Sequence, residues 1–330
     1  MIISRTPLRM SFVGGGSDLP GYYRHNGGGA VVSTAIKKYV YITVNEKFDE
    51  AIRVSYSKTE EVNSVSEIQH KIVRETLLDL GVAGGVEITS VADIPSRGTG
   101  LGSSSAFTVG LLNALHAYKT SFISADALAR GACRIEIEIC GEPIGKQDQY
   151  ASAFGGLNFI QFNEDDSVFV NPIICKRETI EALQNNTLTF YTGITRNASS
   201  ILKTQDENVK SNPEKRDAMK KMVKLAFDVR DSLQKNNLDG FGDALHENWL
   251  LKKSLADDVT STDIEDWYAK GRKAGALGGK LLGAGNGGFL MFYAPKERHR
   301  DITHALQKLR PVDFGFEPEG SKIIFVHKPG

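Results

Sequence analysis

The chain has 330 residues, and at roughly 150 residues per domain this length predicts about two domains. Basic and acidic residues number 40 each, so the formal net charge is zero and no overall field favours nucleic acid or an anionic membrane. The hydrophobic fraction of 41% and the charged fraction of 24% are ordinary for a globular protein, but the 33 glycines exceed the average share of about 7%. A nucleic-acid-binding domain is therefore disfavoured, and the excess of glycine needs an explanation.

The cysteines and the N-terminal segment bear on the compartment. Cys133, Cys140 and Cys175 are dispersed and form no C-x-x-C pair, which fits a reducing compartment and neither a disulfide framework nor a zinc site. The first residues lack the apolar run and small-residue cleavage site of a signal peptide, and no stretch approaches the roughly 18 apolar residues of a membrane span. We expect a cytoplasmic protein without a membrane segment.

The first third of the chain is predicted to be mostly sheet. Alternating or branched apolar residues indicate strands at 9–13, 29–36, 39–48, 52–56 and 85–91. Ser64 and Glu67 form a capping-box pattern ahead of an amphipathic segment, and Gly81 marks the end of that segment. We expect one helix on this sheet between the fourth and fifth strands.

The rest of the chain separates runs of strands from runs of helices. An almost wholly apolar helix at 106–118 must be buried, a second helix covers about 124–140, and strands return at 155–162 and 167–174. Further helices are predicted at 197–209, 213–236, 240–255, 262–275 and 296–309, with strands at 287–294 and 321–328. The polar stretch 175–187 places the domain boundary near residue 180, which gives domains 1–180 and 181–330. This segregation predicts an α+β fold.

The glycines concentrate in five clusters, and the central one has the character of a phosphate site. The segment PSRGTGLGSSSA, residues 95–106, follows a predicted strand and opens the buried helix. A helix N-terminus offers unpaired N–H groups and partial positive charge, and glycine lets the backbone approach a ligand closely. A serine-capped helix after a flexible loop is the alternative, but three consecutive serines exceed what a cap needs.

Two better-known phosphate motifs can be rejected. The Gly-Lys pairs at Gly145 and Gly279 lack the upstream glycine and the following Ser or Thr of a P-loop. Gly283, Gly285 and Gly288 satisfy G-x-G-x-x-G, but the next segment reads as a strand where a dinucleotide fingerprint needs a helix. That loop is expected to serve another ligand or to brace another loop.

Two carboxylates are candidates for chemistry. Asp148 is predicted to lie in a glycine-rich turn between a helix and a strand, where it can project into a cleft. Glu136 borders the buried face of the preceding helix and Glu138 the opposite border, and periodicity alone does not choose between them. A solvated charge or a helix cap is the alternative for each.

Three glycine-rich segments in this order resemble the motifs of the GHMP small-molecule kinases. They are TPLRMSFVGGGSDL, PSRGTGLGSSSA and KLLGAGNGGF, and together they span most of the chain. GEPIGKQDQYAS also resembles the G-x-x-x-G-x-x-D-Q segment of galactokinases. The first segment is most similar to the branch that phosphorylates heptose 7-phosphate at its anomeric oxygen, with the fucose-1-kinases next.

The resemblance implies a fold and a set of roles. It implies an N-terminal domain with a left-handed βαβ crossover, a ferredoxin-like C-terminal domain and an active site between them. ATP would be bound by Gly100, Leu101, Gly102, Ser103, Ser104 and Ser105, and Mg²⁺ by Ser104 and Glu136. Asp148 would take the proton from the sugar hydroxyl, and Arg9 would face that hydroxyl.

The sugar site implied by the resemblance departs from galactokinases. Gly15 and Gly16 stand where those enzymes carry Glu and His, which puts galactose in doubt, while Ser17 and Asp18 complete the segment and Asp18 would hold sugar hydroxyls. Arg196, in YTGITR, could hold a substrate phosphate bidentately. The expected reaction is ATP-dependent phosphorylation of heptose 7-phosphate to the 1,7-bisphosphate.

Other functions remain as alternatives. They are a fucokinase-like or galactokinase-like enzyme acting on an unphosphorylated sugar, a non-catalytic sugar and ATP sensor on the same scaffold, and a decarboxylase of the mevalonate branch. The joint presence of Arg9, Glu136 and Asp148 argues against the sensor. The predicted partner is a small-molecule sugar or sugar phosphate.

Overall fold

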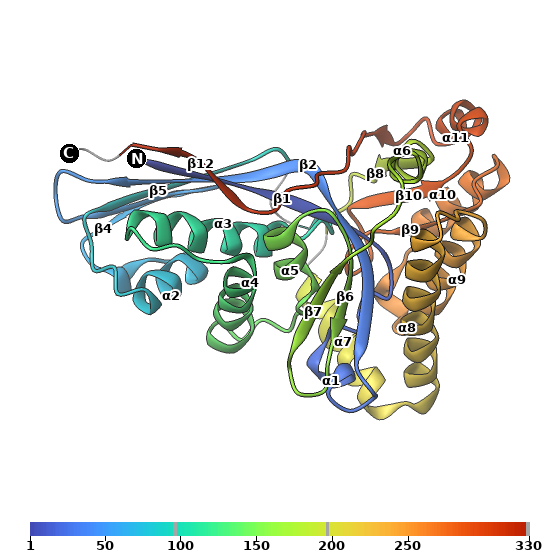
Figure 1. Cartoon of the computed structure of the whole chain (residues 1–330), viewed down its shortest axis with the longest axis horizontal. Coiled ribbons are helices and arrows are strands. Elements are labelled where there is room, and N and C mark those ends of the chain that lie inside the picture. The colour runs from blue at the N-terminus through green and yellow to red at the C-terminus, as the bar shows by residue number, and fades with distance from the viewer. Residues whose placement is uncertain (95–97, 196–197, 328–330) are drawn as a thin grey trace.

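Two sheets and their helices form the molecule. The structure, a computed structural model, describes residues 1–94, 98–195 and 198–327. An eight-stranded sheet takes up most of the first half of the chain, and a four-stranded sheet lies in the second half, as Figure 1 shows. The α+β class is therefore confirmed.

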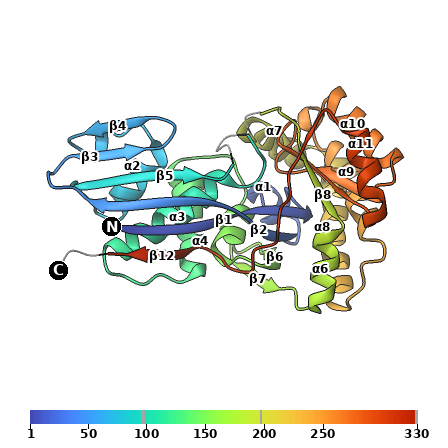
Figure 2. The ribbon, with the colours of Figure 1, turned by 90° about the horizontal axis from the view of Figure 1, so that it is seen from above.

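The first sheet is built on two long antiparallel strands, β1 (Ile2–Val13) and β2 (Gly29–Glu46). The strand order is β12-β1-β2-β5-β3-β4, with β6 and β7 attached to β2. The other strands are β3 (Ile52–Ser55), β4 (Thr59–Val62), β5 (Val86–Ala92), β6 (Leu157–Phe162), β7 (Val168–Pro172) and β12 (Lys322–Val326). Figure 2 shows them side by side, with β12 at one edge and β3 and β4 at the other.

The two strands predicted at 29–36 and 39–48 are a single strand. Ile36 pairs with Leu8 and Tyr39 pairs with Pro7, so Lys37 and Lys38 form a bulge opposite the β1 chain. A bulge bends a strand without ending it. The polar lysine pair interrupts the apolar alternation in the sequence, which is why the prediction split the strand.

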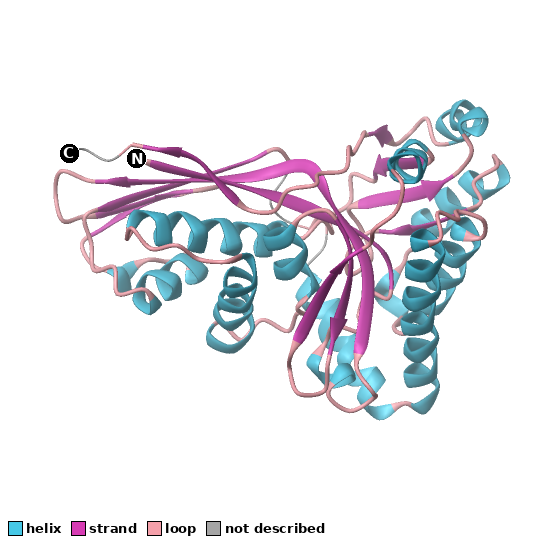
Figure 3. Ribbon diagram, viewed as in Figure 1, coloured by secondary structure: helices cyan, strands magenta, loops and turns pink. Residues whose placement is uncertain are grey.

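Helices α2 to α5 cover one face of the first sheet (Figure 3). Their bounds are Lys71–Asp79, Ser103–Tyr118, Ala125–Cys133 and Gln147–Phe154. The apolar helix α3 lies against β1 and β2 and is buried over most of its length, as its composition predicts. Its N-terminus is directed at the junction of the two halves.

Two helix predictions need correction. Ser64 and Glu67 enclose a 3₁₀ turn, Val65–Glu67, and α2 begins only at Lys71 with the His70 imidazole accepting from the Val73 N–H. Ile68 is extended, which separates the turn from the helix. The helix predicted at 124–140 is α4 followed by a π-helical segment, Arg134–Ile139.

The second sheet has the ferredoxin-like arrangement. Its strands are β8 (Thr187–Tyr191), β9 (Gly278–Leu281), β10 (Phe289–Tyr293) and β11 (Arg310–Pro311), all antiparallel in the order β11-β8-β10-β9. Helices α7 (Ala198–Ser211), α8 (Pro213–Gln234), α9 (Phe241–Lys253) and α10 (Thr262–Lys273) connect β8 to β9, and α11 (His299–Ala305) connects β10 to β11. This is the β-α-β-β-α-β motif with an enlarged first connection.

The end of the chain returns to the first sheet. Strand β12 pairs with β1 and lies along it in Figures 1 and 2. The polar stretch 175–187 contains helix α6 (Arg177–Asn185), and a short helix α1 (Pro20–Tyr23) follows the first glycine cluster. The boundary near 180 stays a prediction, but strand 322–326 belongs to the first sheet.

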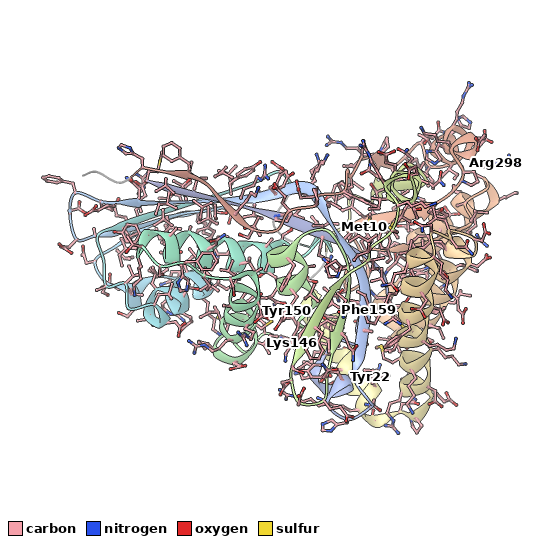
Figure 4. The ribbon with its side chains drawn as sticks, viewed as in Figure 1. Met10, Tyr22, Lys146, Tyr150, Phe159 and Arg298 are labelled. Atoms are coloured by element: carbon pink, nitrogen blue, oxygen red, sulfur yellow. The ribbon has the colours of Figure 1, made fainter. Side chains whose placement is uncertain are left out.

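One apolar cluster of the core spans the two halves. It includes Met10 on β1, Phe159 on β6 and Leu245 on α9. The Phe159 ring meets Phe227 of α8 edge to face, with centroids 4.9 Å apart. Figure 4 labels Met10 and Phe159 on the strands that face these helices. Within the described ranges, no helix combines the length and apolar character that a membrane crossing requires.

Candidate active site

The loop before α3 ends in a helix start that the serines do not cap. Gly102 is the N-cap residue and has a φ of 75°. The start of α3 has no side-chain cap hydrogen bond. Ser103 shares a hydrogen bond with Thr99, and the Ser104 hydroxyl points elsewhere. The first N–H groups of α3 are therefore left for a ligand, which favours the phosphate interpretation over the serine cap.

Glu136 is buried beneath this helix start. The Ser104 hydroxyl donates to Glu136 Oε1 at 2.7 Å, and Gln149 Nε2 donates to Oε2 at 2.7 Å. Burial raises the pKa of the Glu136 carboxyl. Glu138, two residues further along the same segment, is exposed. The structure thus separates two glutamates that periodicity leaves equivalent.

Arg9 and Asp148 form the centre of the site. Arg9 Nε donates to Oδ1 at 2.7 Å and Nη2 donates to Oδ2 at 2.9 Å, while Nη1 donates to the Gly100 carbonyl at 2.6 Å. Asp148 lies in the first turn of helix α5, and not in the glycine-rich turn that the sequence predicts for it. Its side chain keeps 23% exposure against 5% for Arg9. The carboxylate is therefore the partner that a ligand can reach.

The first glycine cluster is tied to α5 by Asp18. The Asp18 carboxylate accepts from the Gly16 N–H at 3.0 Å, from the Gln147 N–H at 3.1 Å and from Gln147 Nε2 at 3.1 Å. Burial raises the pKa of this carboxyl. Ser17 is also buried and donates to the carbonyls of Gly14 and Ala30. Asp18 and Ser17 therefore shape the loop, and their contact with a sugar stays a prediction.

Unpaired polar atoms surround Gly15 and Gly16. A Cβ at Gly15 would lie 3.5 Å from Ser11 Oγ, and one at Gly16 would lie 3.1 Å from Met219 Cε and 3.8 Å from Gln205 Oε1. Among the described residues, Ser11 Oγ and Gln205 Oε1 are buried without a hydrogen-bond partner. A side chain at either glycine position would therefore contact one of these atoms.

The third glycine cluster braces the second. A Cβ on Gly283 would overlap the Cα of Gly100, and a Cβ on Gly288 would overlap the Thr99 carbonyl. Both glycines have positive φ, of 78° and 94°. The G-x-G-x-x-G match therefore serves backbone contact between two loops, one of the two roles the sequence analysis expected for it.

The candidate site residues that the structure describes come together. The loop 100–105, Glu136, Arg9 and Asp148 are linked by the contacts above, and Asp18 reaches them through Gln147. Arg196 lies outside the described residues. Sequence reasoning missed three buried polar side chains at the same place, Gln205 of α7 and Asn248 and Lys252 of α9.

These missed residues contact the glycine loops directly. Asn248 Oδ1 accepts from the Gly14 N–H at 3.0 Å, and Lys252 donates to the Gly283 carbonyl. Their signal in the sequence is a polar pair four residues apart on the inward face of the predicted helix 240–255. Buried polar residues on an otherwise amphipathic helix indicate a site.

Comparison with known proteins identifies the family. The model of the GHMP kinases N terminal domain matches residues 63–156, and that of the GHMP kinases C terminal domain matches residues 229–310. The chain therefore belongs to the GHMP kinases, and the predicted two-domain fold of this family is confirmed.

Individual relatives cover nearly the whole chain. A D-glycero-alpha-D-manno-heptose 7-phosphate kinase of Campylobacter jejuni is 30% identical over 97% of this chain and 98% of its own. A galactokinase of Pyrococcus furiosus is 26% identical over 99% of this chain and 97% of its own. The crystal structure of a D-glycero-D-manno-heptose 1-phosphate kinase from Bacteroides thetaiotaomicron matches with a TM-score of 0.80 and 27% identity, over 99% of this chain and 100% of that chain.

Proposed function

We propose that the chain is an ATP-dependent sugar kinase that phosphorylates D-glycero-D-manno-heptose 7-phosphate at its anomeric hydroxyl, giving the 1,7-bisphosphate. The observation that carries the proposal is the double hydrogen bond between Arg9 and Asp148, held against the Gly100 carbonyl at the entrance of α3. This places a carboxylate beside the loop that is built for phosphate. Phosphoryl transfer asks a protein for this combination of positioning, charge and a base.

ATP binds at the N-terminus of α3 in this proposal. The triphosphate lies against loop 100–105, where the N–H groups of the first helical turn and the αL glycines Gly100 and Gly102 leave room for it. Gly283 supports the loop from behind.

Ser104 and Glu136 fit a magnesium ion. Their oxygens are 2.7 Å apart, and the buried Glu136 carboxylate contacts no cationic side chain among the described residues. Within residues 1–94, 98–195 and 198–327 no group of three or more His, Cys, Asp or Glu could hold a metal. Mg²⁺ suits a site with one carboxylate, because phosphates and water supply its remaining oxygen ligands. When bound, it neutralises charge on the phosphates.

Asp148 acts on the acceptor. Its carboxylate takes the proton of the anomeric hydroxyl while that oxygen forms a bond to the γ-phosphorus, and the bond from the γ-phosphorus to the bridging oxygen of ADP breaks. Arg9 fixes the direction of the carboxylate through two hydrogen bonds, and its charge lies where negative charge accumulates. Orientation of the hydroxyl without proton transfer is the milder version of this role.

The acceptor is recognised around Gly15 and Gly16. Beside these glycines the Ser11 hydroxyl and the Gln205 amide oxygen are buried without a hydrogen-bond partner, and such polar atoms suit a sugar with many hydroxyls. Asp18 holds the loop and Arg196 is our candidate for the acceptor's terminal phosphate. The heptose 7-phosphate kinase relative supports a phosphorylated heptose over galactose, although the structural neighbour is named for a heptose 1-phosphate. Fucose and galactose remain the alternatives.

The proposal includes domains and a compartment. The domains are 1–180 and 181–330, with strand β12 returned to the first sheet. The proposed compartment is the cytoplasm, and it is supported by the use of ATP and by three free cysteines, two of them buried.

A panel of acceptors tests the proposed function. ATP consumption is measured with free sugars and sugar phosphates, including heptose 7-phosphate, heptose 1-phosphate, fucose and galactose. Consumption with heptose 7-phosphate at least tenfold above the free sugars supports the proposal. Turnover of free sugars alone would replace it with the fucokinase-like or galactokinase-like alternative, and nucleotide binding without turnover would favour the sensor.

A further inference from the structure

Two lysines of the second half are buried beside the site, and the mechanism above does not use them. Lys252 of α9 is 4% exposed and Lys280 of β9 is 1% exposed. Lys252 donates to the Gly283 carbonyl, and Lys280 donates to the Phe12 carbonyl at 3.0 Å. In the described part of the chain, neither ammonium has a carboxylate within 4 Å or any other acceptor. Since an ammonium has three donors, each lysine keeps two unused.

Lys252 is the one that faces the chemistry. Its acceptor, Gly283, lies against Gly100, and the Gly100 carbonyl accepts from Arg9. The charges that act on Lys252 are those of Arg9, Asp18 and Asp148. The ammonium therefore lies beside the loop that contacts Gly100 and within the electrostatic reach of Asp148.

Helix α9 is built to hold this side chain in place. Asn248 lies one turn earlier, and its Oδ1 accepts a hydrogen bond from the Gly14 N–H. Its Nδ2 is buried without a hydrogen-bond partner in the described structure. The two residues lie four apart, so they share one face of the helix. That face connects the first glycine loop to the third. Lys253, the next residue, leaves this face and pairs with Glu265 at 2.7 Å.

A buried ammonium without a counter-ion is costly in a folded protein. Such groups persist where a ligand supplies the missing charge. Arg9 already uses its charge on Asp148, whereas Lys252 has two free donors and no ion pair. The missing partner is therefore an anion with oxygen acceptors, placed beside Gly283 and Gly100.

We propose that Lys252 binds an oxygen of a phosphate group in the reaction complex. The oxygen comes from one of two sources, the γ-phosphoryl group of ATP or the phosphate already carried by the acceptor. The position beside Gly283 and Gly100 favours the γ-phosphoryl group. Lys252 acts as a charged ligand and transfers no proton. This inference rests on the proposed kinase function.

The experiment compares Lys252→Met with Lys253→Met, a neighbouring control outside the site. Calorimetry gives the dissociation constants of MgATP and MgADP, and steady-state assays give kcat and KM. For the γ-phosphoryl source, Lys252→Met weakens MgATP roughly tenfold relative to MgADP and lowers kcat on the order of 100-fold. For the acceptor source, both nucleotide constants are unchanged and the KM of the sugar phosphate rises about tenfold or more. Lys253→Met stays near wild type in both cases.

The Lys252→Gln variant distinguishes the role of the lysine charge from the role of its hydrogen bond to the Gly283 loop. Glutamine can still donate to the Gly283 carbonyl, so a purely structural lysine would be replaced by Gln with little loss. The proposal predicts that Gln is as impaired as Met, with a Tm equal to or above wild type because a buried charge has been removed. Near-normal kinetics for Lys252→Met, recovery by Gln, or an equal defect in Lys253→Met would overturn it.

The two nucleotide constants need no acceptor. If the wild-type chain fails to phosphorylate heptose 7-phosphate, the substrate proposed above is wrong, but the ratio of MgATP to MgADP affinity still shows whether Lys252 meets the γ-phosphoryl group. The KM of the acceptor is then measured with the sugar phosphate that the panel of acceptors identifies as a substrate.

Discussion

The guanidinium of Arg9 binds the carboxylate of Asp148 through two hydrogen bonds, of 2.7 and 2.9 Å, although the two residues are 139 positions apart. Strand β1 carries the arginine and the first turn of α5 carries the aspartate. The third donor of Arg9 takes the Gly100 carbonyl at 2.6 Å. One side chain therefore sets the spacing between the proposed base and the proposed phosphate loop, and such a fork has no equivalent in lysine.

Asp148→Asn should lower kcat on the order of a hundredfold or more, with little change in MgATP affinity. The amide cannot take the proton of the acceptor hydroxyl, and general-base removal typically costs about 10²–10⁴ in rate. Steady-state kinetics and calorimetry on one preparation measure both quantities. A smaller drop with a flat pH profile would show that Asp148 only orients the hydroxyl, and an equal loss of ATP binding would remove the assignment.

Glu136→Gln should raise the Mg²⁺ concentration needed for half-maximal rate. A hard cation prefers a charged oxygen, and the amide offers a neutral one. Glu138→Gln is the matched control, because Glu138 is exposed on the same π-helical segment. Magnesium titrations of the rate check the order of the two variants. The reverse order would exclude Glu136 as the ligand.

Gly283→Ala should be far more harmful than Gly81→Ala. Both glycines have positive φ, of 78° and 65°, so each alanine costs about 1–2 kcal/mol of backbone strain. Only at Gly283 does the added Cβ meet another backbone, that of Gly100, whereas Gly81 has open space. Thermal unfolding should show a larger loss for Gly283→Ala, together with weaker MgATP binding. Equal effects would contradict the bracing role of the third loop.

The kcat/KM of the acceptor should fall as the pH rises above about 8. Burial and the charge of Arg9 lower the pKa of Lys252 to about 8, so the free enzyme loses this cation above that pH. Asp18 and Asp148 act in the opposite direction, and the nearby Lys280 has its pKa lowered mainly by burial. In Lys252→Arg the side chain stays charged, so the fall in kcat/KM should shift to higher pH. If the fall occurs at the same pH in the arginine variant, a group other than Lys252 causes it.

Much of the fold follows from local patterns. The apolar helix α3, the long strand pair and the glycine loops are visible in the sequence because burial and turn geometry impose periodicity and glycine directly. The sequence pattern does not predict the bulge at Lys37 and Lys38 or the short strand β9, because both depend on pairing with a neighbouring strand. Strand β12 was predicted, but its place in the first sheet depends on a contact with β1.

The candidate site divides in the same way. The phosphate loop has a local motif, whereas the choice of Glu136 over Glu138 depends on the contacts of Glu136 with Ser104 and Gln149, which helical periodicity does not specify. Lys252 and Asn248 were missed because a charged residue on an amphipathic helix is usually solvated. Only the approach of α9 to the two glycine loops gives them a role.

The most direct test is phosphorus NMR of the product formed from ATP and heptose 7-phosphate by the wild-type chain. The account predicts one new phosphate signal that is coupled to the anomeric proton, with the original 7-phosphate signal retained, so that the product carries two phosphates. A new phosphate at any other position, or no transfer to the sugar while fucose or galactose is phosphorylated, would contradict the proposed acceptor.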